Sequence, residues 1–185
     1  REAGSAALDG LEATNFISNA AIRFDLTARL LESILEAGQF ADPRAGIALA
    51  SLADGMANDM GENARVHALQ GRALLAAGDT EQAAAQLRTA TFYESQRAQP
   101  LRLADWFLLL AEAEPENRDD HVMQAFRALE AIRPLLPTID QVTEESLFSL
   151  RIQPVFSAAV DVQLAQAGDD AGRVLLAQRI VESFR

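Results

Sequence analysis

The residues of this chain that could carry metal chemistry are few and far apart. Its two histidines, His67 and His121, fall in different helical segments. A histidine-based metal site needs more ligands converging on one point, so we expect His67 to be a packed or half-exposed helix residue. The acidic run near His121 lacks the alternating Asp/Asn ligands and central Gly of a calcium loop, which favours a solvated loop without metal or cofactor. Its members are Glu112, Glu114, Glu116, Asp119 and Asp120.

Catalytic side chains are equally hard to place. The sequence contains no Cys, which excludes cysteine nucleophiles, disulfides and thiolate metal sites within it. Ser, His and Asp all occur, but no nucleophile elbow or comparable motif surrounds any of them. We therefore expect no catalysis from this chain itself.

Arg65 and Arg72 form a candidate binding pair. They lie seven residues apart, about two helical turns, and therefore on one face of the same expected helix. Two neighbouring cations are a local exception in a chain of net charge −11. They could hold the carboxylates of an acidic peptide or of a neighbouring domain through bidentate hydrogen bonds. Alternatively, they pair with nearby Glu or Asp side chains of the chain itself and contribute little.

Composition indicates a helical protein without general affinity for nucleic acid. Of the 185 residues, 49% are apolar and 6% aromatic. The chain has 16 basic residues, all of them Arg, and 27 Asp and Glu. An acidic chain repels phosphate backbones at long range, so we expect no nucleic-acid partner. Sustained alternation of apolar and polar residues is lacking, which predicts almost no sheet. Apolar runs are too short for a membrane span, so we expect a soluble protein.

The elements that position these side chains are clearest from Ala64 to Gln96. Apolar residues recur at helical spacing on both sides of Gly78 and Asp79, a pattern in which Gly ends one helix and Asp caps the next. Gln82 is placed to complete a capping box. The segment resembles a tetratricopeptide (TPR) repeat of about 34 residues. The matching residues are Gly71, Ala73, Leu74, Gly78, Asp79, Ala83, Leu87 and Ala90.

Neighbouring units are expected because a single repeat leaves an apolar face open. Turn signals similar to Gly78 recur at Gly38 and Gly168, and Asp42 before Pro43 is typical of a helix start. We predict an all-α, right-handed solenoid of about four antiparallel helix pairs, forming a single TPR-like domain that is a fragment of a longer protein. The expected units cover residues 11–61, 64–96, 100–137 and 143–185, after a frayed lead-in at 1–10.

Two residues depart from a regular repeat pattern. Trp106 falls where the central unit has Gly71, so either the register of its helix pair shifts or the pair splays. Pro154 lies inside an apolar helical pattern, where we expect it to kink the helix.

The last third of the chain resembles a more specific family. AFRALEAIRPLLP at 125–137 and TEESLFSLRIQPVF at 143–156 are similar to the helical region before the caspase-like protease domain of bacterial CHAT proteins. The resemblance implies that the catalytic His and Cys lie beyond Arg185 and that this chain is a regulatory or binding segment. It implies a bacterial protein, in the cytoplasm or the periplasm.

The TPR resemblance implies where a protein or peptide partner would bind. In stacked TPR-like units the first helices line the concave side, and their exposed residues would touch the partner. Alternatively, these positions are ordinary surface or inter-repeat contacts. The candidate residues are Arg65, Ala68, Arg72 and Leu75 in the central unit, Asp25, Ala28 and Glu32 in the preceding unit, and Leu103 and Phe107 in the following unit.

These observations predict a protein-interaction scaffold or regulatory module that presents or regulates a C-terminal caspase-like domain. One alternative is a regulatory domain that senses a small molecule in its groove, and another is a structural spacer. A sealed apolar pocket would favour the small molecule, whereas an open groove of mixed charge would favour a peptide. The oligomeric state stays open.

Overall fold

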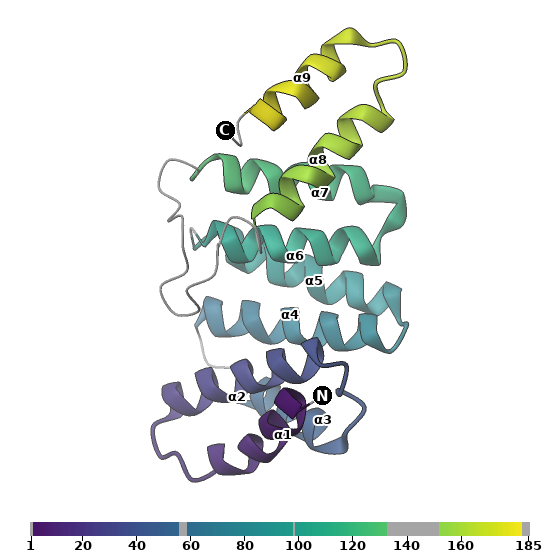
Figure 1. Cartoon of the computed structure of the whole chain (residues 1–185). Coiled ribbons are helices and arrows are strands. Elements are labelled where there is room, and N and C mark those ends of the chain that lie inside the picture. Colours follow the sequence, from purple (N-terminus) through teal and green to yellow (C-terminus); the bar gives the residue numbers. More distant parts are fainter. Residues whose placement is uncertain (1, 56–58, 98, 133–151, 183–185) are drawn as a thin grey trace. The chain divides into compact units, whose positions relative to one another are not determined.

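The computed structural model describes residues 2–55, 59–97, 99–132 and 152–182 (Figure 1). These residues form nine α-helices and one short 3-10 helix, η1, and no strand occurs among them. The prediction of an all-α protein is confirmed. The elements are α1 (Glu2–Thr14), α2 (Ala20–Glu36), α3 (Pro43–Asp54), α4 (Met60–Ala76), α5 (Thr80–Ser95), α6 (Pro100–Ala113), η1 (Pro115–Asn117), α7 (Arg118–Glu130), α8 (Gln153–Ala165) and α9 (Ala171–Glu182).

The chain divides into two compact units, Arg1–Arg97 and Ala98–Arg185. The first contains α1 to α5 and the second α6 to α9. Organisation of the whole chain as one TPR-like domain stays a prediction. Within the described ranges, none of the helices combines the length and the hydropathy that a membrane span requires.

The turn between α4 and α5 forms as the sequence predicts, with one difference. Gly78 has a φ of 82°, a conformation that Gly adopts without a Cβ clash. The Asp79 carboxylate accepts a hydrogen bond from the Gln82 backbone N–H at 3.1 Å. The capping box itself does not form: the Asp79 N–H already donates to the Leu74 carbonyl, so the Gln82 side chain donates to the Asp79 carboxylate instead.

The α4–α5 pair packs closely through its small residues. A Cβ built at Gly71 would lie 2.6 Å from Cγ of Leu87 and 3.2 Å from the Ala83 carbonyl oxygen, so only Gly fits without a shift. Ala83, Leu87 and Ala90 are fully buried on α5. Ala83, one of the residues that match the TPR pattern, is thus buried where α5 approaches α4. α4 also packs against α2 and α3, which places it between the two preceding helices and α5.

The start of the chain differs from the expectation of a frayed lead-in. α1 begins at Glu2 and packs against α2, which contacts α1 more extensively than it contacts α3. Gly10 allows this approach, since a Cβ there would lie 3.2 Å from the Leu30 side chain, and Ala7 and Leu8 are buried. The first expected helix pair is therefore extended to three helices. The described buried residues of α1 follow helical spacing, but only Ala7, Leu8 and Leu11 among them are apolar, because Gly4 and Thr14 hold the other buried positions.

In the second unit, α7 packs against both α6 and α8, and α8 packs against α9 (Figure 1). On α6 the small residues of the core are Ala104 and Ala111, while Trp106 is buried under the Arg102 guanidinium, 5.9 Å from the ring centroid. The core of this unit thus includes Ala104 and Ala111 of α6, while the choice between a shifted register and a splayed pair stays a prediction. The kink expected at Pro154 stays a prediction. α8 begins at Gln153, directly after the π-helical residue Ile152, and the residues immediately before Ile152 lie outside the described ranges. The expected end of the third unit, at 137, and the expected start of the fourth unit, at 143, lie outside the described residues.

Candidate functional site

Arg65 of α4 is held by two carboxylates of α2. Its Nε and Nη2 donate to the two carboxylate oxygens of Glu32, each at 2.9 Å, and its Nη1 donates to Asp25 Oδ1 at 2.8 Å. Only 11% of the Arg65 side chain is exposed. All three guanidinium nitrogens are thus engaged within the unit. Of the two interpretations that the sequence left open for Arg65, the geometry shows the internal ion pair.

The electrostatics of this cluster favour the charged forms of Arg65 and Asp25. Burial alone would lower the pKa of Arg65, but the hydrogen bonds and charges of Glu32 and Asp25 outweigh burial and raise that pKa above its ordinary value. Burial alone would raise the pKa of Asp25, but hydrogen bonding to Arg65 and the charge of Arg29 hold it below its ordinary value. Arg29 donates from Nε to Asp25 Oδ2 at 2.8 Å. The cluster is therefore a fixed ionic link between α2 and α4.

The other residues expected on a concave surface differ in exposure. Ala68 and Ala28 are buried, so the expectation that they are exposed is wrong; their small side chains lie inside helix contacts. Arg72 is partly exposed and its Nη2 lies 3.9 Å from Glu36 Oε1, a weak ion pair. Leu75 is half-buried.

The two candidate residues on α6, Leu103 and Phe107, belong to the second unit and are half-buried. Phe107 packs against the core of that unit. Binding of a partner to the predicted concave residues stays a prediction.

The histidines take structural roles. His67 lies between α4 and α5, where Nδ1 is 2.7 Å from Gln86 Oε1 and the ring stacks on Tyr93 at 6.0 Å, as a packed helix residue should. His121 Nε2 is 2.8 Å from Glu114 Oε2, and Glu114 is only 4% exposed. The expectation of a solvated loop is therefore wrong for Glu114, because His121 supplies it with a partner inside the fold. No group of three His, Asp or Glu suited to a metal lies among the described residues.

A groove of about 660 Å³ opens between α1, α2 and α3, and we call it the α1–α3 groove. Its apolar lining includes Leu11, Phe24 and Leu52. Ile47 on α3 also lines it and is 70% exposed. Sequence patterns do not predict this groove, although Ile47 gives a local signal, because it is an apolar residue off the stripe of Ala45, Leu49 and Leu52 that α3 buries.

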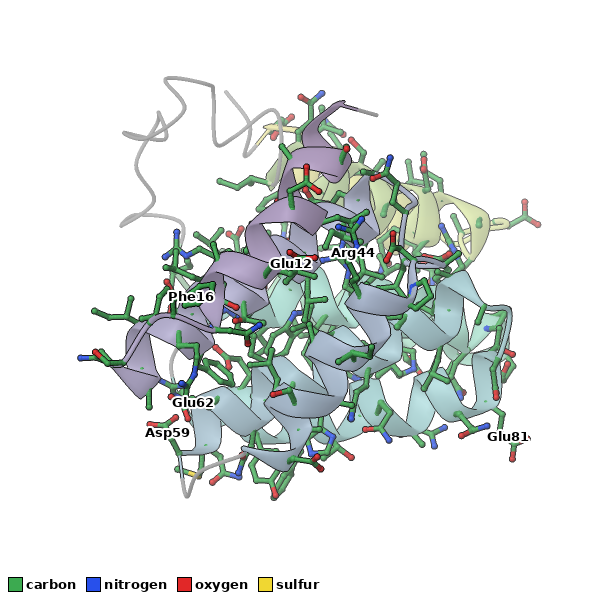
Figure 2. The ribbon with its side chains drawn as sticks, turned by 90° about the horizontal axis from the view of Figure 1, so that it is seen from below. Glu12, Phe16, Arg44, Asp59, Glu62 and Glu81 are labelled. Atoms are coloured by element: carbon green, nitrogen blue, oxygen red, sulfur yellow. The ribbon has the colours of Figure 1, made fainter. Side chains whose placement is uncertain are left out.

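Charged side chains of both signs lie along the α1–α3 groove. Arg44 is paired with Asp42 at 3.1 Å and with Asp9 at 3.3 Å, while Arg23 donates from Nη1 to the Ile17 carbonyl at 3.3 Å. Figure 2 shows Arg44 and Glu12, a residue of α1, on the same face of this unit. The site is therefore an open groove of mixed charge with an apolar lining. The remaining charged lining residues are Glu12 and Glu62.

No protein-family model, no curated protein and no solved structure matches the chain. The resemblances to TPR repeats and to CHAT proteins therefore rest on the sequence motifs alone.

Proposed function

We propose that this chain is a helical-repeat module that binds a peptide segment of another protein, or of a neighbouring domain, in the α1–α3 groove. The observation that carries the proposal is the groove itself, which is open, has an apolar lining and bears both signs of charge. An open site suits a peptide segment whose two ends continue into solvent, whereas small-molecule pockets bury most of their ligand. The small-molecule alternative is therefore less well supported, and we assign no catalysis to the chain.

The proposal includes a stack of TPR-like units in a right-handed solenoid. Its support is the packing of α4 against both α2 and α3, since in a repeat stack each unit covers its neighbour. Further support is the turn chemistry at Gly78 and the close approach at Gly71. Both features are those for which the sequence resembles a TPR repeat.

The module would present or regulate a C-terminal caspase-like domain of the CHAT type. This part of the proposal is supported by the sequence similarity of 125–137 and 143–156. Much of that sequence lies outside the described residues. A partner segment in the groove would then link binding to the activity of the following domain.

The test is a selection from a random-peptide display library on the immobilised chain, followed by affinity measurements with the selected peptides. We expect Ile47→Asp to weaken their binding by more than about tenfold, because it places a charge in the apolar lining. Ala50→Asp is the matched control, since Ala50 is an exposed residue of the same helix and is not in the groove lining. Failure to select any peptide, or equal losses from both substitutions, would contradict the proposal.

A further inference from the structure

The apolar part of the α1–α3 groove is suited to anchor a hydrophobic side chain. Ile47 is largely exposed in the groove. Phe16, which follows the groove residue Asn15 in sequence, is 89% exposed and lies at the end of α1 (Figure 2). Exposed apolar side chains gathered near a concave site are typical of a surface that a partner covers.

The charged residues of the groove differ in whether they have an ion-pair partner. Arg44 already has two carboxylate partners. The carboxylates of Glu12 and Glu62, in contrast, have no cation within ion-pairing distance among the described residues. The charged residues of the groove lining, together with the two ion-pair partners of Arg44, are two arginines and four carboxylates. Their net charge is −2. The six residues are Arg23, Arg44, Glu12, Glu62, Asp9 and Asp42.

We infer that the partner segment carries an apolar residue flanked by Arg or Lys. The apolar residue would cover Ile47, and the basic residues would meet the carboxylates of Glu12 and Glu62. This inference rests on the proposed function and names the partner's chemistry. It differs from an acidic peptide bound by Arg65, because the donors of that guanidinium are engaged by Glu32 and Asp25.

The two free carboxylates contribute unequally. Glu62 lies in the first turn of α4, where the positive end of the helix dipole offsets part of its charge. The guanidinium of Arg97 lies against Gly61, the residue before Glu62, and adds positive potential there. Glu12 is an exposed residue in the last turn of α1, where the negative end of the helix dipole adds to its charge. Glu12 therefore contributes more to binding of a basic segment.

The experiment uses the peptides selected from the random library, labelled with fluorescein and measured by fluorescence anisotropy. We expect the selected sequences to place Arg or Lys beside an apolar residue. Glu12→Gln with Glu62→Gln should weaken their binding about fivefold, equivalent to about 1 kcal/mol, and added salt should reduce this difference. Glu81→Gln is the control, because Glu81 is an exposed first-turn residue of α5 outside the groove (Figure 2).

A substitution that is expected to strengthen binding tests the same inference, because a partly unfolded variant could not bind more tightly. Arg23→Glu removes a cation from the groove lining and should strengthen binding of a basic peptide severalfold. Selected peptides with acidic flanks, or unchanged affinity in both the Gln and the Arg23→Glu variants, would overturn the inference. If such peptides still lose binding to Ile47→Asp, the proposed function stands; if no peptide binds at all, both fail.

Discussion

The α4–α5 pair and the α1–α3 region belong to the same compact unit, yet the first is closed and the second is open. At Gly71 of α4 the partner helix approaches so closely that a Cβ would lie 2.6 Å from Leu87 Cγ. At Gly46 of α3 no heavy atom would lie within 4 Å of an added Cβ. Glycine therefore lies at a close helix contact on α4 but at an open position on α3.

A helical glycine has a packing role only where a neighbouring helix occupies the space that a side chain would fill. Gly inside a helix costs about 1 kcal/mol relative to Ala because it loses more backbone freedom on folding. At Gly71 the close approach of Leu87 and Ala83 offsets that cost. Gly46 is exposed and lies outside the groove lining, so it has no such compensation among the described residues.

The largest effect should come from filling the closed contact. Gly71→Leu would force the α4–α5 pair apart, and we expect it to lower the free energy of unfolding by about 3 kcal/mol. Urea unfolding followed by circular dichroism would measure the change. Gly46→Leu is the control and should stay within about 1 kcal/mol of the wild type. Equal losses from the two substitutions would remove the distinction between the regions.

The opposite side of the closed contact gives a second test. Ala83 is fully buried on α5, so Ala83→Leu should overpack the interface and destabilise the protein by about 2 kcal/mol. Thermal melting of the variant would show the loss. Unchanged melting would mean that the α4–α5 pair adapts freely, and the likeness of this pair to a TPR repeat would lose its main physical support.

Arg65 joins the two regions, because it connects α4 of the closed pair to α2 beside the groove. Arg65→Ala leaves the carboxylates of Glu32 and Asp25 without their strongest hydrogen-bond donor, and we expect a loss of about 1.5 kcal/mol at neutral pH. Arg72→Ala is the matched control on the same helix, with an ion pair of 3.9 Å, and should cost less than about 0.5 kcal/mol.

The loss caused by Arg65→Ala should depend on pH in a defined direction. The folded-state pKa of Asp25 is below its ordinary value of 3.8. The stability that this carboxylate contributes is thus present above pH 3.8 and disappears as the pH falls through the lower folded-state pKa. The wild type and the variant should therefore converge in stability below pH 3.8. A gap that stays constant in acid would place the effect of Arg65 in packing rather than in charge.

Local chemistry explains which elements the sequence could predict. Gly78 and Asp79 determine the turn of the closed pair through backbone conformation and capping, both of which depend on adjacent residues. α1 was missed because two of the five described residues that it buries, Gly4 and Thr14, are not apolar, so the apolar residues alone form too short a pattern.

The candidate site depended still more on contacts between distant residues. The partners of Arg65 lie 33 and 40 residues away in sequence, so its engagement in ion pairs required the packing of α2 on α4. The groove requires α1, α2 and α3 together, and Ile47 alone gave a local sign of it as an apolar residue off the buried stripe. Exposure of Ala68 was mispredicted because helical spacing assigns a face but not the neighbour that covers it.

The smallest effect, and the one of opposite sign, is expected from the open region. Gly46→Ala adds a methyl group where nothing lies within 4 Å and removes the backbone entropy that Gly loses in a helix, so it should stabilise the protein by about 0.7 kcal/mol. Gly71→Ala makes the same chemical change against Leu87 and should destabilise it, because the steric shift outweighs the gain in helix propensity. Chemical denaturation of the two variants in parallel would measure both. If both substitutions stabilised the protein, the Leu87 side chain would have to move away from residue 71 at no energetic cost. The close contact at Gly71 would then exclude only side chains larger than Ala.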